Sequence, residues 1–215
     1  MTEARKTPSN IAFTASVKAI QSRRGSRSAY ARMESGAGWA TAITSDLADF
    51  IASQSSVFLA TANATGQPYI QHRGGPPGFL QVLDEKTIAF ADFRGNRQFI
   101  SAGNLAENPK AHLFLIDYPT RQRIKLWGTA RVVEGDPALI ARLMPPDYKA
   151  QGEQAVIFHV EAWDANCPQH IPQRFDAADV ERALAKRDQR IAELEAEIAR
   201  LNRADLPLGR VAGSS

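Results

Sequence analysis

The chain has 215 residues, of which 44% are hydrophobic and 23% charged, a composition typical of a soluble globular protein. It lacks the roughly 18 consecutive apolar residues of a membrane-spanning helix and the short apolar core of a secretory signal, so we expect a cytoplasmic protein with no membrane contact. Its single cysteine excludes an internal disulfide framework and a zinc site built from several thiolates.

The charge is unevenly distributed along the chain, although the formal net charge is only +3. Residues 1–45 contain seven Lys and Arg against two Asp and Glu, whereas residues 46–179 contain twelve against fifteen. A mildly acidic body is a poor match for a nucleic-acid backbone, so we expect no nucleic-acid partner. Binding of nucleic acid through the basic arm is a weaker alternative, and it would be steeply salt-dependent.

Residues 1–45 are predicted to form a basic helical arm. Phe13, Val17 and Ile20 recur at helical spacing, which indicates one or two short helices. Ser45 is a candidate N-cap for a further helix that leads into the body of the protein.

Residues 46–175 have the pattern of a β domain. Short runs rich in β-branched and aromatic residues alternate with turn signals, which predicts antiparallel strands closed or partly closed into a barrel. A helix is predicted over 96–107, with Phe99, Ile100 and Leu105 facing inward, and Gly128 suggests a bulge or a close backbone approach. The predicted strands cover 56–63, 67–73, 78–84, 86–92, 111–118, 121–134 and 154–163.

The C-terminal part of the chain has a different periodicity. Over 176–203, apolar residues fit the a and d positions of about three heptads, with Arg187 as the one exception. Such a seam either pairs with its copy in a homodimer or lies on its own barrel. Residues 204–215 are predicted to be a disordered tail.

The common catalytic motifs are absent from the sequence, including the nucleotide-binding glycine loops, the GxSxG elbow and the HExxH zinc motif. The four histidines lie on separate predicted elements without ligand spacing, so we expect no metal site. His112 and His159 are interpreted as strand residues satisfied by their neighbours.

Three clusters of basic and amide residues suggest a binding pocket. In "GQPYIQHRGGPPGF", Arg73 ends a strand beside backbone that a flat ligand can approach closely, because Gly74 has no Cβ. In "ADFRGNRQF", Asn96, Arg97 and Gln98 open a predicted helix, whose free N–H groups suit a phosphate. An ordinary hairpin loop and a capped surface helix are the alternatives.

The third cluster is "RQRIKLWG", in which Arg121, Arg123 and Lys125 share one strand face. Like charges in a row repel one another, so an anionic partner would explain them, although a solvated edge strand would also tolerate them. Together the three clusters describe a pocket for a planar ligand that ends in a phosphate.

From about residue 56 to 134 the sequence resembles the pyridoxamine 5'-phosphate oxidase-like FMN-binding proteins. The runs "GQPY", "FADFRGNRQ", "NLAENPKAHLFL" and "RQRIKLWGTARVVE" follow that family's core pattern in order and spacing. The resemblance implies a mainly β protein with helices, built on a six-stranded antiparallel split β-barrel. It also implies a homodimer that binds FMN between its two protomers.

The resemblance places cofactor contacts on specific residues of this chain. It implies that the strand ending at residue 73 lines the ring and ribityl chain, that the 96–98 segment contacts the phosphate, and that the 121–134 strand approaches from the dimer mate. Ala91 and Asp92 replace the family's usual aromatic and threonine pair. The predicted cofactor-binding residues in these segments are Gln71, His72, Arg73, Gly74, Asp92, Asn96, Arg97, Gln98, Arg123 and Lys125.

The sequence also departs from the family's pattern. The true oxidases have a lysine where this chain has the "GGPP" turn, and their C-terminal arginine and histidine pattern is replaced by "AWDANCPQHIPQRF". In that segment Asn166 and Gln169 are predicted to contact a flavin or substrate, whereas Cys167 beside His170 lacks the third group that an activated thiolate requires.

Two functions follow as hypotheses. The first is an FMN-dependent oxidoreductase that acts with a small-molecule substrate or electron donor, in which Arg73 and Arg97 neutralise the phosphate. The alternative is a dimeric module that binds a flavin, a deazaflavin or haem without catalysis, because split barrels serve several chemistries.

Overall fold

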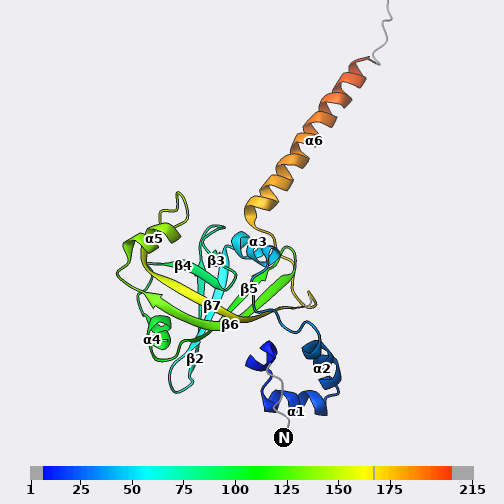
Figure 1. Ribbon diagram of the computed structural model, residues 1–215. Coiled ribbons are helices and arrows are strands. Elements are labelled where there is room, and N and C mark those ends of the chain that lie inside the picture. Colours follow the sequence, from blue (N-terminus) through cyan, green and yellow to red (C-terminus); the bar gives the residue numbers. More distant parts are fainter. Residues whose placement is uncertain (1–6, 167, 205–215) are drawn as a thin grey trace, which may run out of the picture. The chain divides into compact units, whose positions relative to one another are not determined.

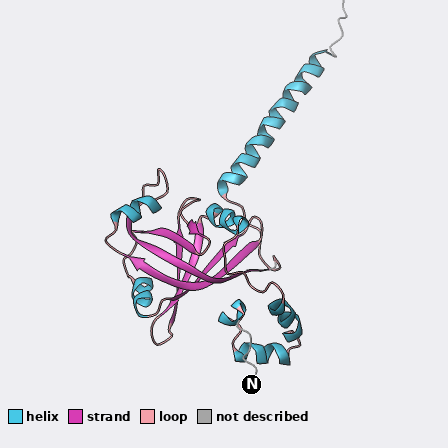
Figure 2. Ribbon diagram, in the orientation of Figure 1, coloured by secondary structure: helices cyan, strands magenta, loops and turns pink. Residues whose placement is uncertain are grey.

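The computed structural model describes residues 7–166 and 168–204, and it divides into two compact units, Met1–Ile171 and Pro172–Ser215. The first unit contains all the strands (Figures 1 and 2). The second contains the long helix α6, Ala177–Ala204. The predicted 204–215 tail therefore falls almost wholly outside the described residues, as does Cys167.

Seven antiparallel strands form one sheet in the order β2-β1-β5-β6-β7-β4-β3. The antiparallel arrangement, the flanking helices and the seven strand segments read from the sequence are confirmed, but the six-stranded barrel that the resemblance implied has the wrong strand count. In the described residues β2 and β3 form the two edges and do not pair with each other, so closure of a barrel is not shown. The strands are β1 Ser56–Ala62, β2 Pro68–Gly74, β3 Gln81–Asp84, β4 Thr87–Phe93, β5 Lys110–Asp117, β6 Gln122–Val133 and β7 Gly152–Asn166.

Most of the sheet buries one side of its strands. Along β1 and β6 buried and partly exposed residues alternate strictly over most of the length, as a period of two requires when one face meets a core. The larger of two hydrophobic clusters lies on this side, and its fully buried members include Leu59, Leu113, Leu126 and Phe158 from four different strands. Strand β4 is buried on both faces, because a second, smaller cluster covers its other side.

Gly128 marks a bulge between β6 and β7, where the pairing register shifts between Trp127 and Gly128. A Cβ at this position would lie 1.9 Å from the carbonyl oxygen of His159, so only glycine permits so close an approach. The predicted bulge and close approach are both confirmed.

The sheet curves enough to bring β2 close to β4, although four strands stand between them in the sheet order. Arg73 near the end of β2 and Asp92 near the end of β4 form an ion pair. Helix α4, Ile100–Glu107, packs against β1, β2 and β6 beside this junction. The residues that connect β4 to α4 therefore lie next to the end of β2.

Helix α4 begins four residues later than the sequence predicted. Arg97 and Phe99 have left-handed backbone, each with φ of 55°, which a right-handed helix cannot contain. Leu105 is buried as expected, but Phe99 and Ile100 are 49% and 40% exposed, so their predicted inward orientation is wrong.

The N-terminal arm contains the short helix η1, Pro8–Ile11, and the helices α1, Ala15–Arg23, and α2, Arg27–Ser35. It packs on the sheet through Trp39, whose ring stacks on that of Trp127 in β6 with centroids 4.5 Å apart. The Trp163 indole N–H donates to the carbonyl oxygen of Ala42.

Two further helices flank the sheet. Helix α3, Ser45–Ser53, is capped by Thr44, whose hydroxyl accepts a hydrogen bond from the Leu47 backbone N–H, so the cap lies one residue before the predicted Ser45. Helix α5, Pro137–Leu143, precedes β7. Among the described residues, no helix is both long enough and apolar enough to cross a membrane.

Candidate functional site

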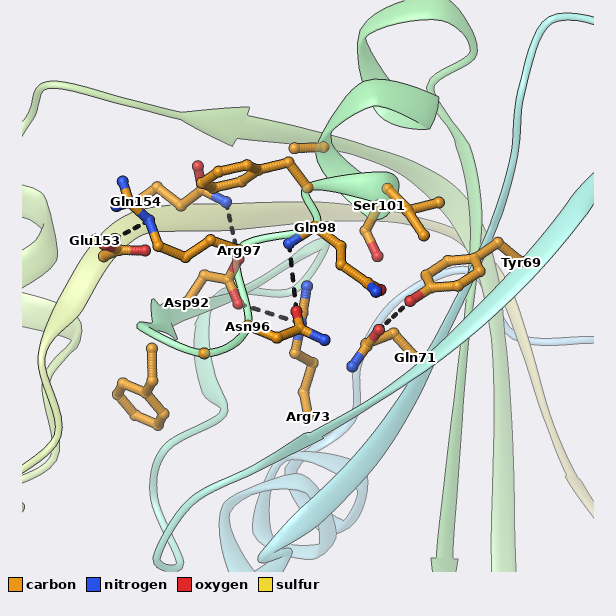
Figure 3. Close-up of a pocket in the computed structure, with 15 residues that line it drawn as sticks. Tyr69, Gln71, Arg73, Asp92, Asn96, Arg97, Gln98, Ser101, Glu153 and Gln154 are labelled. Carbon is orange, nitrogen blue, oxygen red and sulfur yellow. Dashed lines mark hydrogen bonds and ion pairs between the residues drawn. The ribbon is translucent and has the colours of Figure 1, made fainter.

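Two adjacent cavities of about 220 and 210 Å³ lie where β2, β4 and the segment before α4 meet. The first cavity extends to the start of α4 and to β7, and the second extends along β2 and β4. Figure 3 shows the first cavity, with side chains from all of these elements around it. The residues that belong to both walls are Gln71, Arg73, Asp92, Phe93 and Gly95.

Strand β2 supplies the first side of the site. Tyr69, Gln71 and Arg73 lie at alternate positions and share the face that lines the first cavity, and the Tyr69 hydroxyl donates a hydrogen bond to Gln71 (Figure 3). His72 does not line the first cavity but lines the second, and its ring nitrogen is 2.8 Å from the Ser56 hydroxyl. Gly74 forms part of the second cavity's wall.

Arg73 is held at the centre of the site by Asp92. Its Nε lies 3.2 Å from Asp92 Oδ1, but this N–H does not point at the oxygen and makes no hydrogen bond, although it is fully buried. The other carboxylate oxygen, Asp92 Oδ2, accepts a hydrogen bond of 2.8 Å from the buried Gln154 amide. Asp92 is therefore anchored from β7, and Arg73 keeps a buried donor without an acceptor.

The start of α4 supplies a second unpartnered group. Ser101 is 5% exposed, it lines the first cavity, and its hydroxyl has no hydrogen-bond partner. Phe99 stands at the N-cap position with left-handed backbone, and no side chain caps the helix. Uncapped N–H groups and a free hydroxyl at a helix N-terminus suit an anion.

The segment between β4 and α4 carries three of the predicted residues. Asn96, Arg97 and Gln98 all line the first cavity, and the Asn96 side-chain oxygen accepts a hydrogen bond from the Gln98 backbone N–H. Arg97 Nε lies 3.4 Å from a carboxylate oxygen of Glu153, and the guanidinium stands over the Phe99 ring. Half of the Arg97 side chain is exposed, so it borders the cavity from the solvent side.

Arg123 and Lys125 lie on β6 and do not line either cavity of their own protomer. Lys125 Nζ is 2.8 Å from Asp164 Oδ2 and stands over the rings of Trp39 and Trp127. Arg121 lies before the strand, in left-handed backbone. Whether Arg123 and Lys125 contact a cofactor bound by a second protomer stays a prediction.

His112 belongs to the same aromatic group, because its ring packs edge-on against Trp127. Burial, together with the charge of Lys125, lowers the pKa of His112 from 6.5 to about 4. It is therefore a neutral residue satisfied by its neighbours at physiological pH. Its strand position agrees with the sequence interpretation.

Two predicted contact residues belong to the C-terminal segment. Asn166 ends β7, where its backbone pairs with Arg123 in the sheet, and the exposed Gln169 belongs to a turn that includes His170. Gln169 lines neither cavity of this protomer, and Cys167 lies outside the described residues. Contact of Asn166 with a ligand stays a prediction.

Sequence reasoning missed four polar side chains of the lining. Tyr69 shares a strand face with Arg73, so the period of two could have identified it. Ser101 was hidden by the wrong helix start, because the first turn was placed at 96–99. Glu153 and Gln154 come from β7, about 60 residues after Asp92, and only the register between Asp92 and Gln154 brings them to the site.

The cavity walls combine charged, polar and aromatic side chains. They contain two guanidiniums, each paired with a carboxylate, together with amides, hydroxyls and phenylalanine rings. Within residues 7–166 and 168–204, no group of three or more His, Cys, Asp and Glu side chains could hold a metal ion.

Comparison with solved structures finds distant similarities. A FMN-binding protein from Syntrophomonas wolfei is 13% identical with a TM-score of 0.43, and the match covers 56% of this chain and 84% of that one. HutZ, the heme storage protein from Vibrio cholerae, is 18% identical with a TM-score of 0.42, with 57% and 93% covered. HupZ from Group A Streptococcus is 16% identical with a TM-score of 0.47, with 61% and 99% covered.

The search of curated proteins finds no match. A family model described as pyridoxamine 5'-phosphate oxidase matches residues 43–173, a range that begins just before α3 and contains every strand and both cavities. The chain therefore belongs to the pyridoxamine 5'-phosphate oxidase family.

Proposed function

We propose that this protein binds FMN at the junction of β2, β4 and α4 and acts as a flavin-dependent oxidoreductase. The observation that carries the proposal is the pair of buried polar atoms without partners, Arg73 Nε and Ser101 Oγ, on the wall of one cavity. Each such group costs about 1–3 kcal/mol when it is unsatisfied, and an anionic ligand with several acceptor oxygens would satisfy both.

The phosphate end of FMN fits the first cavity. The uncapped N-terminus of α4, the Ser101 hydroxyl and the amide of Gln98 offer hydrogen-bond donors there, and Arg73 and Arg97 provide positive charge. Asp92 holds the Arg73 side chain in place from the opposite side. Because Arg73 pairs with Asp92 and Arg97 pairs with Glu153, a dianion at this point would share each guanidinium with a carboxylate.

The ring of FMN fits the second cavity, which is more apolar. Phe79, Phe90 and Phe93 contribute to its wall, together with the backbone of Gly74. Flat apolar walls with a few polar groups at one end are typical of cofactor sites. When bound, FMN would supply the hydride or electron transfer that the protein's own side chains cannot perform.

We propose that a second copy of the chain completes this site. Ligand pockets usually measure about 300–1,000 Å³. Each of the two cavities is smaller, at about 220 and 210 Å³, although they share a wall. A partner protomer would add the missing wall, and Arg123 or Lys125 of the partner would approach the cofactor there. A small substrate or electron donor would then enter beside the ring.

Haem is the second candidate ligand, as part of a module without catalysis. Haem iron takes its axial ligand from a His, Cys, Met or Tyr side chain. His72 lines the second cavity, with Nε2 hydrogen-bonded to Ser56, and the Tyr69 hydroxyl in the first cavity donates to Gln71. The guanidinium and amide groups of the first cavity are typical of phosphate binding, so we prefer a phosphorylated flavin, or the chemically similar deazaflavin, over haem.

The absorption spectrum of the purified protein tests this proposal. We expect the two absorption bands of a flavin, in the near-ultraviolet to visible range, and both should bleach on reduction by dithionite or a reduced nicotinamide. Mass spectrometry of the released ligand should identify FMN. A Soret band would favour haem, and the mass of a deazaflavin would change the assigned cofactor. A colourless protein that takes up no added FMN would refute the proposal.

A further inference from the structure

Helix α6 carries an apolar stripe that nothing in the described structure covers. Its six large apolar side chains are each 43–56% exposed. They are Val180, Leu184, Ile191, Leu194, Ile198 and Leu201. We propose that this stripe pairs with α6 of a second copy in a parallel, in-register, two-stranded coiled coil.

The heptad positions follow from the spacing of these residues. Leu184, Ile191 and Ile198 occupy successive a positions seven residues apart. Val180, Leu194 and Leu201 occupy d positions, and Arg187 occupies the remaining d position between them. Isoleucine at a combined with leucine at d is the pattern that favours two parallel strands over larger assemblies.

Charges beside the seam select the parallel orientation. The e positions hold Glu181, Asp188 and Glu195, which are all acidic. An antiparallel pair places e against e of the partner, so these carboxylates would repel one another. A parallel pair places g against the following e, which brings Arg190 against Glu195 of the partner subunit on both sides of the seam.

Arg187 gives the in-register pair a charged contact across the seam. A side chain at d packs between residues of the facing helix that include the adjacent e position, so Arg187 would lie beside Asp188 of the partner subunit. This contact forms twice in the in-register pair and offsets the repulsion between the two arginines. A shift by one heptad would place Arg187 beside Glu181 or Glu195 of the partner subunit instead, but it would leave one heptad of the apolar stripe unpaired at each end, so full overlap of the stripe sets the register.

We prefer a second copy of this chain as the partner of the apolar stripe, because both charge contacts are self-complementary. Asp188, which would pair with Arg187, is the next residue of the same sequence. Glu195, which would pair with Arg190, lies five positions after that arginine. A helix of another protein would need this same pattern. The pairing does not depend on the cofactor, so the absorption test above and the tests below can fail separately.

Disulfide trapping in the full-length protein tests the orientation. In a Cys167→Ser background the introduced thiol is the only one, since the chain has one cysteine. Val180→Cys at a d position should form a disulfide-linked dimer under mild oxidation. Ala178→Cys, two residues away at an outward b position, is the matched control and should cross-link far less.

A mixture of the Val180→Cys and Leu201→Cys proteins, unfolded and refolded together, distinguishes the two orientations. The two positions are about 31 Å apart along a helix. A parallel pair yields only 180–180 and 201–201 disulfides, whereas an antiparallel pair yields 180–201 disulfides and overturns the proposal. Equal cross-linking of Val180→Cys and Ala178→Cys would show mere proximity and also overturn it.

A charge exchange tests the contact between Arg187 and Asp188 of the partner subunit. Arg187→Glu places like charges across the seam and should weaken pairing about tenfold or more, read as the protein concentration needed for half-maximal cross-linking of Val180→Cys. The double variant Arg187→Glu with Asp188→Arg restores the contact with its signs reversed and should recover most of the cross-linking. A weakened double variant, or a trimer or tetramer in analytical ultracentrifugation of the uncross-linked protein, would contradict the proposal.

Discussion

At the residue scale, the site is defined by groups that its own protomer leaves unsatisfied. Ser101 and Arg73 each bury a polar atom without a partner, and both atoms border the same cavity. Native proteins rarely leave such groups unpaired, because an unpaired buried group loses its hydrogen bonds to water without replacement. Their position together indicates a ligand rather than two unrelated packing defects.

The substitution Ser101→Ala tests this interpretation. It should leave the cofactor-free protein as stable or more stable, by up to about 1 kcal/mol, because it removes an unsatisfied hydroxyl. It should weaken FMN binding about tenfold, because a hydrogen bond to a charged phosphate is lost. Urea unfolding and a fluorescence titration measure the two effects.

Ser28→Ala is the matched control, because Ser28 is the second residue of α2, as Ser101 is of α4, and is exposed. It should change neither quantity. A large loss of stability in Ser101→Ala with unchanged FMN affinity would show that Ser101 has a purely structural role.

The lowered pKa of His112 predicts how the free energy of unfolding depends on pH. Burial, followed by the charge of Lys125, lowers its pKa to about 4 in the folded state, against 6.5 when unfolded. Between pH 4 and pH 6.5 the unfolded state binds more protons than the folded state. The free energy of unfolding therefore keeps the full contribution of His112 above about pH 6.5 and loses it as the pH falls toward 4, by at most about 3 kcal/mol. Denaturant unfolding from pH 7 to pH 4 measures the loss.

The variant His112→Phe removes this titration while keeping a ring against Trp127, so its stability should fall less over the same pH range. His159→Phe is the control, because His159 is exposed on β7. If both variants keep the pH dependence of the parent protein, then His112 is not its source.

At the scale of elements, the strands were predictable because their signal is local. The alternation of Ile124, Lys125 and Leu126 across β6 follows from a period of two and is confirmed by burial on one side only. The start of α4 was not predictable in this way, because Arg97 and Phe99 adopt left-handed backbone that their residue types do not favour.

The pairing of strands that are distant in the sequence could not be predicted from the sequence either. Gln154 reaches Asp92 only through the antiparallel register of β4 with β7, a contact between residues 62 positions apart. The predicted residues near Arg73 and Asn96 do line the cavities, since each belongs to a local motif. Arg123 and Lys125 do not line them, because their expected role depends on a second protomer.

The β6 bulge provides a test at this scale. Gly128→Ala would place a methyl group 1.9 Å from the His159 carbonyl oxygen and force the two longest strands apart. We expect a loss of about 3 kcal/mol in the free energy of unfolding. Gly95→Ala, where an added Cβ meets nothing within 4 Å, should change it far less. Equal effects of the two substitutions in urea unfolding would contradict the role given to the bulge.

At the scale of the whole molecule, the chain combines a family fold with a separate helical unit. Residues 43–173 carry the match to the pyridoxamine 5'-phosphate oxidase family, and α6 follows it as a compact unit of its own. Both units offer surfaces that a second copy would complete, the cavities in the first unit and the apolar stripe in the second. A homodimer is proposed for each unit on separate grounds, and each proposal has its own test.

The affinity of the purified, cofactor-stripped protein for FMN relative to riboflavin tests the central claim most directly. Riboflavin has the same ring but lacks the phosphate, so loss of two charge-assisted hydrogen bonds should make it bind about a hundredfold more weakly than FMN. In a protein carrying both Ser101→Ala and Arg73→Gln this preference should largely disappear. Equal affinity for the two flavins in the unmodified protein, or an undiminished preference in the double variant, would contradict a phosphate held between β2 and α4.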